Sequence, residues 1–364
     1  MSLTVDYLEV KEFRNYEWFL LELDRGLTII EGPNAAGKTN LIEALQLLLA
    51  GESFRNPRWR DVIREGAERS RISLTASGDG RDVSVVLDVD RGKGREYRLN
   101  GTKRRSVSAA TGTIPCVLFT PDDLMMVKGP SETRRGTLDS LGAQMSVVYD
   151  SLRKEYARLL RHRNALLKDQ LWGEPLDVIT DQLVGAGTRL ISHRESLLAR
   201  VSARATEVFS DLTAGGRLGC EYQHSWTREG LAGEHDEEAF PNALAASRQR
   251  ERARGVTIVG PHRDDVRILI DGKEARSFAS QGQQRTAALS WKLAEVSVIE
   301  EVVGQPPLLL LDDVMSELDK DRRHALARLV NESVQTVVTT TNLQYFEPAM
   351  LEKGRVVSIR GGSK

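Results

Sequence analysis

A glycine-rich segment between a predicted strand and a predicted helix constrains this chain more than any other feature. It matches the pattern G-x-x-x-x-G-K-[ST] and consists of Gly32, Pro33, Asn34, Ala35, Ala36, Gly37, Lys38 and Thr39. An apolar strand pattern ends at Ile30, and leucines at helical spacing begin at Leu41. In such a loop the backbone N–H groups converge on phosphate oxygens, the lysine reaches the outer phosphates and the threonine hydroxyl binds magnesium. The segment predicts a site for a nucleotide such as ATP with Mg²⁺.

A continuous apolar run at 308–311 ends in two carboxylates, Asp312 and Asp313. Such a run is typical of a central parallel strand that is buried on both faces. Ligands bind at the carboxyl ends of strands in sheets of this kind. We expect Asp312 to join Thr39 in holding Mg²⁺ and Asp313 to orient the attacking water. A core strand with an acidic turn would explain the run alone, but beside Lys38 the two carboxylates predict a catalytic centre.

The third segment is Ser-Gln-Gly-Gln at 280–283, directly before a predicted helix. The Ser280 hydroxyl and the Gly282 N–H would form a second anion site at the helix N-terminus, with Gln283 completing the pattern S-x-G-Q. An ordinary N-terminal cap explains the tetrapeptide equally well. The order of phosphate loop, S-x-G-Q, acidic strand and Ser-Glu-Leu-Asp at 316–319 resembles that of the ABC ATPase superfamily.

The predicted elements divide into two lobes. Residues 1–123 and 255–364 carry the strand patterns and the nucleotide motifs, whereas residues 124–254 are helical and heavily charged. The segment 70–106 alternates apolar and polar residues and predicts an antiparallel sheet. We therefore expect an α/β fold: a P-loop ABC-type ATPase head with a mixed β-sheet and an antiparallel subdomain, interrupted by an inserted α-helical lobe.

Six stretches carry a resemblance to one family within that superfamily. They are EFRNY at 12–16, NAAGKTNLIEAL at 34–45, FTPDDL at 119–124, GPHRDD at 260–265, SQGQQR at 280–285 and LLLDDVMSELD at 309–319. With them the chain resembles the RecF family of bacterial DNA replication and repair proteins, which have ABC/SMC-like ATPase heads, along nearly its whole length. The resemblance implies a trans role for Ser280, Gly282 and Gln283, on the nucleotide that a second protomer holds. It also implies that nucleotide is bound by Gly32, Asn34, Gly37, Lys38 and Thr39.

The resemblance implies an ATP-dependent DNA-binding protein of recombinational repair, replication restart and the SOS response. ATP would join two heads into a clamp on single-stranded, duplex or junction DNA, and weak, DNA-stimulated ATP hydrolysis would release it. RecR and RecO proteins would be its partners. SMC ATPases are similar but insert a coiled coil of several hundred residues between the first two motifs, and this chain is too short to contain one.

Two other functions are compatible with a phosphate loop. The main alternative is the energy-coupling ATPase subunit of an ABC transporter. Such subunits usually carry Glu where Asp313 stands and a switch histidine after the last core strand, where this chain has Thr339-Thr340-Thr341-Asn342. A phosphoryl-transferring metabolic kinase is a third possibility, although it has no use for S-x-G-Q.

Charge and cysteine content limit the partners and the compartment. The chain has 51 Lys+Arg against 52 Asp+Glu, so any surface that binds DNA must be local. Two basic runs, at 91–105 and 153–168, are candidates, and a merely solvated face explains each of them equally well. The two cysteines, and a sequence without a signal-peptide core or an apolar stretch of membrane-spanning length, predict a cytoplasmic protein without a membrane partner.

Two assignments stay open at this level. His262, in the GPHRDD stretch, fits either a catalytic role or a turn at the junction of the lobes. One threonine of Thr339–Thr341 takes the place of the switch histidine, but the pattern does not distinguish among the three. No motif assigns the glutamine loop that usually joins the lobes of such heads.

Overall fold

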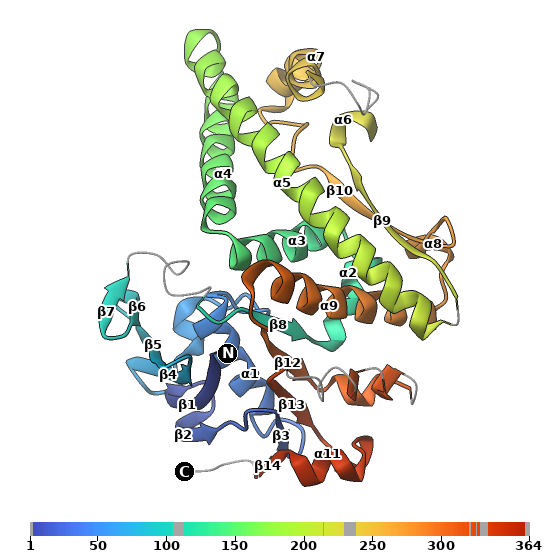
Figure 1. The fold of residues 1–364 in the computed structure, drawn as a ribbon. Helices are drawn as coiled ribbons and strands as arrows, with labels where there is room; N and C mark the ends of the chain where they lie inside the picture. Colours follow the sequence, from blue (N-terminus) through green and yellow to red (C-terminus); the bar gives the residue numbers. More distant parts are fainter. Residues whose placement is uncertain are drawn as a thin grey trace. The chain divides into compact units, whose positions relative to one another are not determined.

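The computed structural model (Figure 1) divides the chain into two compact units. Unit 1 comprises Met1–Asp123 and Glu295–Lys364, and unit 2 comprises Leu124–Ala294. The structure describes residues 3–104, 113–213, 215–228, 238–319, 322–324, 326–327 and 334–360.

Unit 1 contains a five-stranded sheet in the order β14-β3-β13-β12-β8, and every neighbouring pair in it is parallel. Its strands are β3 (Leu27–Glu31), β8 (Cys116–Phe119), β12 (Leu308–Asp312), β13 (Thr336–Thr340) and β14 (Arg355–Ser358). All five residues of β12 are buried, so the prediction of a central strand covered on both faces is confirmed. The carboxyl ends of β3, β13 and β12 therefore lie side by side at one edge of the sheet.

A second sheet of unit 1 has six strands, all antiparallel, in the order β2-β1-β4-β5-β6-β7. The antiparallel sheet predicted for 70–106 is present and is larger than expected, because the first two strands of the chain join it. Its strands are β1 (Thr4–Phe13), β2 (Tyr16–Glu22), β4 (Arg69–Gly78), β5 (Arg81–Asp90), β6 (Gly94–Leu99) and β7 (Thr102–Arg104).

Helix α1 (Lys38–Leu49) packs between the two sheets. Its side chains Leu41, Leu45 and Leu48 share one apolar core with Leu74 of β4 and Leu310 of β12. Burial of one leucine side chain contributes roughly 1.5–3 kcal/mol, so this core fixes the loop that precedes α1 on a rigid base. Shorter elements complete the unit: η1 (Trp59–Val62), η3 (Pro121–Asp123), η4 (Val314–Ser316), η5 (Leu343–Tyr345) and α11 (Pro348–Lys353).

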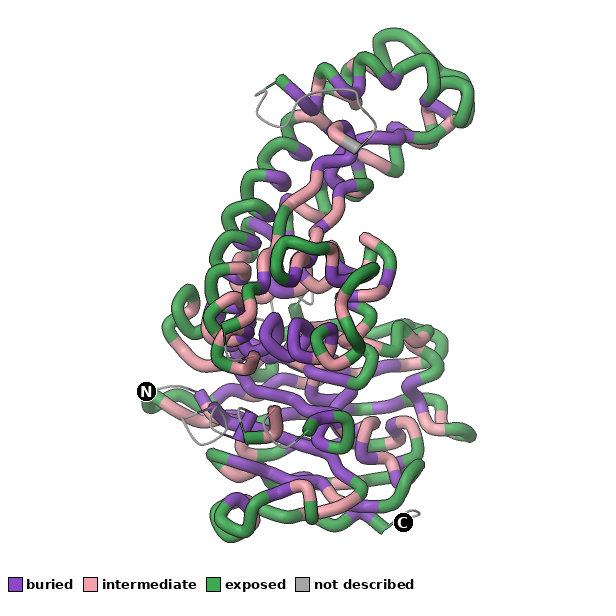
Figure 2. Tube along the Cα trace, turned by 90° about the vertical axis from the view of Figure 1, so that its right-hand side faces the viewer, coloured by how far each residue is buried: buried purple, intermediate pink, exposed green. Residues whose placement is uncertain are grey.

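Unit 2 is largely helical, with a three-stranded antiparallel sheet in the order β11-β10-β9. The long helices α4 and α5 pair along one buried stripe and leave many residues exposed (Figure 2). None of the helices in the described residues is both long and apolar enough to cross a bilayer. The elements are α2 (Leu124–Lys128), α3 (Ser131–Met145), α4 (Val147–Lys168), α5 (Glu174–Leu212), β9 (Leu218–Gln223), α6 (Ser225–Arg228), α7 (Ala239–Arg254), β10 (Asp265–Ile270), β11 (Lys273–Glu274), α8 (Ala275–Phe278) and the part of α9 (Gln281–Val303) up to residue 294.

The boundaries of the units differ from the predicted lobes at one point. The first change, between 123 and 124, coincides with the prediction, whereas the chain returns to unit 1 within α9, at residue 295, and not at residue 255. The reason is that β10 pairs with β9, which lies inside the predicted helical lobe, and not with a strand of unit 1. The α/β fold with parallel and antiparallel strands and a helical lobe is confirmed.

Candidate active site

The glycine-rich loop connects β3 to α1, and its two glycines are needed for steric reasons. Gly37 has φ 108°, and a Cβ atom there would lie 2.5 Å from Nδ2 of Asn15 and 2.7 Å from the Tyr16 hydroxyl. A Cβ atom on Gly32 would lie 2.3 Å from the carbonyl oxygen of Ile359. Any larger side chain would displace the loop from its neighbours, so its tight path depends on both residues.

Lys38 is buried and turned back over the loop. Its Nζ donates to the carbonyl oxygens of Gly32 at 2.8 Å and Pro33 at 2.9 Å. A buried ammonium group needs polar partners, and these two carbonyls supply them. The contacts hold the positive charge inside the concave side of the loop, where a bound anion would meet it.

Asp312, at the end of β12, joins the loop to the sheet. Its Oδ1 accepts a hydrogen bond from Thr39 Oγ1 at 2.9 Å and another from Thr339 Oγ1 at 2.7 Å. Thr339 lies directly opposite Asp312 in the register of β12 and β13. The hydroxyl of Thr39 and the carboxylate of Asp312 are hard oxygen ligands of the kind that Mg²⁺ prefers, so the pair fits that ion. The structure thus brings together the two residues predicted as metal ligands.

Asp313 combines an unusual backbone conformation with a buried carboxylate oxygen. Its φ is 52°, in the left-handed region, and its N–H donates to Thr339 Oγ1 at 2.9 Å. Its Oδ1 is buried without a hydrogen-bond partner in the described residues. Burial raises the pKa of the Asp313 carboxyl, and the negative charge of Asp312 adds to this, whereas Lys38 opposes it. The free carboxylate oxygen and the raised pKa are suited to accepting a proton.

The three threonines near the end of β13 differ in their surroundings. Thr339 and Thr340 are fully buried, and only Thr341 is exposed. The Thr340 hydroxyl donates to the carbonyl oxygen of Asn342 at 3.0 Å. The Thr339 hydroxyl alone contacts both aspartates, since it donates to Asp312 and accepts from the Asp313 N–H. The sequence pattern does not single out Thr339, because its contacts depend on the register of two strands.

The S-x-G-Q segment lies in unit 2, at the N-terminus of α9, and forms a reciprocal cap. Ser280 Oγ accepts from the Gln283 N–H at 3.2 Å, and Gln283 Oε1 accepts from the Ser280 N–H at 2.9 Å. The capping interpretation is therefore correct as local geometry. Ser280 and Gln283 are exposed and Gly282 is half-buried, so the segment is also accessible to a ligand. Its role toward a nucleotide stays a prediction.

His262 lies in the interior of unit 2. Its Nε2 bonds the carbonyl oxygen of Thr257 at 3.1 Å, which requires a proton on Nε2, so Nδ1 accepts from the Tyr156 hydroxyl at 2.8 Å. Burial lowers the pKa of the imidazole to about 4. A neutral imidazole with a hydrogen bond at each nitrogen fits a role in stabilising the turn that contains it, although this turn lies inside unit 2 and not at a junction of the lobes.

Ion pairs neutralise part of the first basic run. Glu96 pairs with both Arg98 and Lys103, and Arg98 also pairs with Asp88 at 2.8 Å. The run therefore presents less charge than its composition suggests. The exposed cations that remain are Arg91, Lys93, Arg95 and Arg104, and Arg105 lies outside the described residues.

The second basic run is neutralised to a similar degree. Asp150 pairs with both Arg153 and Lys154, and Arg163 is buried in an ion pair with Glu251 at 2.7 Å. Arg163 thus belongs to the core of unit 2 and not to a surface. Lys154 is exposed but paired, and the other exposed cations of this run are Arg158, Arg161 and Lys168.

Comparisons with known proteins find relatives along nearly the whole chain. The family described as RecF/RecN/SMC N terminal domain matches residues 4–362. The chain is 38% identical to the DNA replication and repair protein RecF of Gloeobacter violaceus over 98% of this chain and 96% of that one. It is 40% identical to the same protein of Symbiobacterium thermophilum, over 93% of this chain and 91% of that one.

Solved structures show the same similarity. A structure described as the recombination mediator protein RecF-ATP in the RecFOR pathway superposes with a TM-score of 0.87 and 31% identity, over 95% of this chain and 94% of that one. An Smc head domain from Pyrococcus furiosus superposes with a TM-score of 0.57 at 18% identity, over 99% of this chain and 94% of that one. The second match concerns the fold alone.

Proposed function

We propose that this chain, which belongs to the RecF family of DNA replication and repair proteins, is an ATP-dependent DNA-binding protein of recombinational repair, replication restart and SOS induction. One observation carries the nucleotide part of the proposal. The hydroxyl of Thr39 in the glycine-rich loop lies 2.9 Å from the Asp312 carboxylate at the end of β12, although the two residues are far apart in sequence. This contact joins a phosphate loop to an acidic strand end, the arrangement that binding and hydrolysis of ATP require.

Each residue of the site has a separate task in this proposal. Lys38 binds the outer phosphates with a charge that the loop already holds in place. Thr39 and Asp312 would hold Mg²⁺, which neutralises phosphate charge when it is bound. Asp313 orients the attacking water and accepts its proton through the carboxylate oxygen that has no partner among the described residues.

The switch is proposed to operate between two copies of the chain. Ser280, Gly282 and Gln283 lie on the accessible N-terminus of a long helix, where the helix dipole favours an anion. They would close on the nucleotide held by the second copy, so ATP would create a dimer that clamps DNA and weak, DNA-stimulated hydrolysis would open it. RecR and RecO proteins are the proposed partners. The proposed location of the protein is the cytoplasm.

The same relatives weigh against the alternative of a transporter subunit, because those compared are named DNA replication and repair proteins. The proposal is tested by the rate of ATP hydrolysis with and without duplex and gapped DNA. We expect hydrolysis to be slow without DNA and faster with it. A rate that no DNA substrate changes would contradict the proposed DNA-stimulated switch.

Replacing Ser280 with Arg is expected to block the ATP-dependent dimer and tight DNA binding while single copies still bind ATP. The substitution puts a bulky cation where the partner's nucleotide must enter. Sizing chromatography with ATP measures the dimer, and fluorescence anisotropy measures DNA affinity. Ser146→Arg is a matched control, because Ser146 caps α4 in the same unit by accepting from Tyr149 N–H at 3.2 Å. A monomeric Ser280→Arg protein that still bound DNA tightly would overturn the clamp.

Replacing Thr339 with Val is expected to slow hydrolysis by about 10- to 100-fold with little change in ATP affinity. The reason is that the hydroxyl positions both aspartates, and a hydrogen bond to a charged group contributes about 1.5–3 kcal/mol. Single-turnover kinetics and nucleotide titration separate the two quantities.

Two further variants make this prediction specific. Thr339→Ser retains the hydroxyl and should restore most of the rate. Thr340→Val removes a buried hydroxyl on the same strand that bonds the Asn342 segment and neither aspartate, so it should leave the rate of a folded protein nearly unchanged. Equal loss of rate in both valine variants would indicate a general packing effect.

A further inference from the structure

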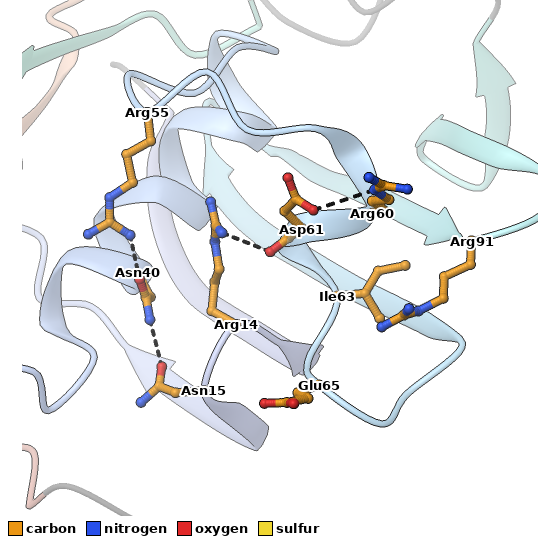
Figure 3. Close-up of a pocket in the computed structure, with 9 residues that line it drawn as sticks. All are labelled: Arg14, Asn15, Asn40, Arg55, Arg60, Asp61, Ile63, Glu65 and Arg91. Carbon is orange, nitrogen blue, oxygen red and sulfur yellow. Dashed lines mark hydrogen bonds and ion pairs between the residues drawn. The ribbon is translucent and has the colours of Figure 1, made fainter.

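An open pocket of unit 1 adjoins the glycine-rich loop and belongs to the candidate active site (Figure 3). Its Asn15 side chain donates to the Ala36 carbonyl of the loop at 3.2 Å, and its Asn40 directly follows Thr39. The arginines that line this pocket are therefore part of that site. A separate surface rich in arginine lies in unit 2, where helices α4, α5 and α7 pack against one another.

The tip surface of unit 2 consists of residues 168–178 and 248–254. The first segment runs from the end of α4 to the start of α5 (Figure 1), and the second is the C-terminal part of α7. An ion pair joins the two segments, because the guanidinium of Arg248 lies 2.8 Å from the Asp177 carboxylate. The two segments are therefore neighbours on one surface.

Three large apolar side chains of the tip surface are open to solvent. Leu171 is 54% exposed, Trp172 is 45% exposed and Val178 is 49% exposed. The connection between α4 and α5 is ordered, because the Leu171 N–H donates to the Leu166 carbonyl at 2.9 Å. Apolar side chains that gather on an ordered surface indicate a binding site, since the packing of unit 2 leaves them uncovered.

The tip surface also carries an excess of positive charge. Its α7 segment reads Arg-Gln-Arg-Glu-Arg-Ala-Arg, with all four arginines exposed, and Lys168 is a fifth exposed cation. Among the described residues, Lys168, Arg252 and Arg254 form no ion pair. Glu251 is buried in its pair with Arg163 at 2.7 Å. The other carboxylates of the two segments are Asp169, Glu174 and Asp177.

An arginine stacks on the exposed tryptophan. The guanidinium of Arg252 lies 4.9 Å from the centre of the Trp172 ring. Cations in the last turn of a helix also stabilise its dipole, which accounts for Arg252 and Arg254 but not for the tryptophan beside them. The contact places a group that binds phosphate next to a flat aromatic surface. Surfaces that bind single-stranded nucleic acids combine these two features.

We propose that the tip surface binds single-stranded DNA. Trp172 stacks on an unpaired base, and Arg252 and Arg254 bind neighbouring phosphates. Duplex DNA is a poorer ligand, because its bases already stack on one another and offer no face to the tryptophan. The inference rests on the proposed function in taking DNA as the ligand. It adds a contact that a single copy of the chain makes without ATP.

The central test compares two single strands of equal length on the full chain without nucleotide. One is an oligothymidylate, and the other is an abasic strand with the same phosphates. Anisotropy should show that the parent binds the oligothymidylate about 5- to 150-fold more tightly, the contribution of one stacked base. Trp172→Ala should lose this preference, whereas Trp172→Phe retains an aromatic ring and should keep most of it. The abasic strand should bind all three proteins equally.

The arginines are tested by the salt dependence of binding. Arg252→Ala/Arg254→Ala should weaken the binding of both strands. The slope of log affinity against log salt should shrink by about 0.7 for each phosphate that the variant no longer neutralises. This change corresponds to a loss of about fivefold per phosphate at 0.1 M salt, and the loss should disappear near 1 M salt.

Matched controls change the same residue types away from the tip surface. Trp18→Ala removes a tryptophan of unit 1 that is 50% exposed. Arg200→Ala/Arg204→Ala removes two exposed arginines of α5 about 40 Å along the helix axis from its start. Both variants should keep the affinity for single-stranded DNA within about twofold of the parent. Thermal unfolding must show that every variant is folded.

The outcomes distinguish this inference from the proposed function. If the parent binds no DNA with or without ATP, the proposed function fails. If the parent binds DNA but does not prefer oligothymidylate to the abasic strand, or if Trp172→Ala keeps that preference, the tip surface is not the proposed site and the function stands. If Trp172→Ala weakens ATP-dependent dimerisation or duplex binding as much as single-strand binding, the inference is wrong.

A competition experiment separates DNA from an acidic protein as the ligand. Unlabelled oligothymidylate should displace the labelled strand from the parent, and poly-L-glutamate of equal charge should do so poorly, since it has no bases to stack. Equal displacement by poly-L-glutamate would show a surface for acidic proteins and contradict the proposal. A preference for bases that depends on Trp172, together with a salt slope that depends on the arginines, supports it.

Discussion

Replacing Lys38 with Met is expected to abolish tight ATP binding. Lys38 is the cation of the glycine-rich loop, and its ammonium group is buried against the carbonyl oxygens of Gly32 and Pro33. Removing one partner of a desolvated charge pair costs about 2–5 kcal/mol, which corresponds to a dissociation constant raised about thirtyfold to several thousandfold. Titration with a fluorescent ATP analogue measures the effect, and ATP-dependent dimerisation should disappear with it.

The control for this prediction is Lys11→Met, which changes an exposed lysine of β1 that pairs with Glu9 at 2.8 Å. It should leave nucleotide affinity unchanged. Thermal unfolding without nucleotide must show that the Lys38→Met protein is folded, because the two carbonyls of the loop lose their donor. A folded Lys38→Met protein with the affinity of the parent would remove the loop from the ATP site.

Local patterns in the sequence predict much of unit 1. The run 308–311 is apolar without interruption because β12 is covered on both faces, and this property can be read from a short segment. The position of Leu41, Leu45 and Leu48 at helical spacing likewise predicts α1, whose buried face they form. Strand β14 is short and three of its four residues are exposed, so no burial pattern indicates it.

The return boundary of the helical lobe is not predictable in the same way. The alternating pattern of 266–270 correctly indicates a strand, β10, but a strand pattern does not name its partner. Here the partner is β9, within the helical lobe, and so β10 and β11 belong to unit 2. The apolar segment 256–259 also predicts a strand, but the structure has none there.

In the candidate site, too, local patterns predict some residues, whereas others depend on which strands pair. Thr39, Asp312 and Asp313 follow from spacing and residue type, and the structure brings Thr39 and Asp312 together. Thr339 does not follow, since its contacts arise from the pairing of β12 with β13. The sequence also shows that residue 313 is Asp without explaining why. Its left-handed φ of 52° is a conformation that Asp and Asn adopt more often than longer residues do, but Glu12 has a φ of 51° in the same chain, so the backbone favours Asp without requiring it.

Replacing Asp313 with Asn is expected to slow hydrolysis by about 10²- to 10⁴-fold, the usual contribution of a general base. Asn fits the left-handed backbone as well as Asp does, and it keeps the N–H that bonds Thr339. ATP binding should therefore survive, and the protein should accumulate as a nucleotide-bound dimer. Rapid-quench measurement of ATP cleavage and sizing chromatography with ATP test the two parts. A nucleotide-bound protein that remained monomeric would contradict the second part.

The control is Asp271→Asn, which makes the same exchange at another left-handed position, φ 50°, in a turn of unit 2. It should change neither hydrolysis nor dimerisation, because Asn Oδ1 can still accept the hydrogen bond from Arg217 N–H at 3.0 Å. If Asp271→Asn slowed hydrolysis as much as Asp313→Asn, the loss could not be assigned to a general base.

The raised pKa of Asp313 adds a dependence on pH that separates chemistry from folding. As a base the carboxyl must be ionised, so hydrolysis by the parent should fall as pH drops through the raised pKa, at a higher pH than an ordinary aspartate would give. The folded state binds this proton more tightly than the unfolded state does, so ionisation lowers stability as pH rises through the same window. Asn cannot ionise, and Asp313→Asn should therefore unfold at a higher temperature than the parent above that window and equal it below. A variant that becomes more stable while it loses hydrolysis has lost a reactive group and not its fold. This result is expected if the left-handed backbone and partial burial of Asp313 lower stability and support hydrolysis.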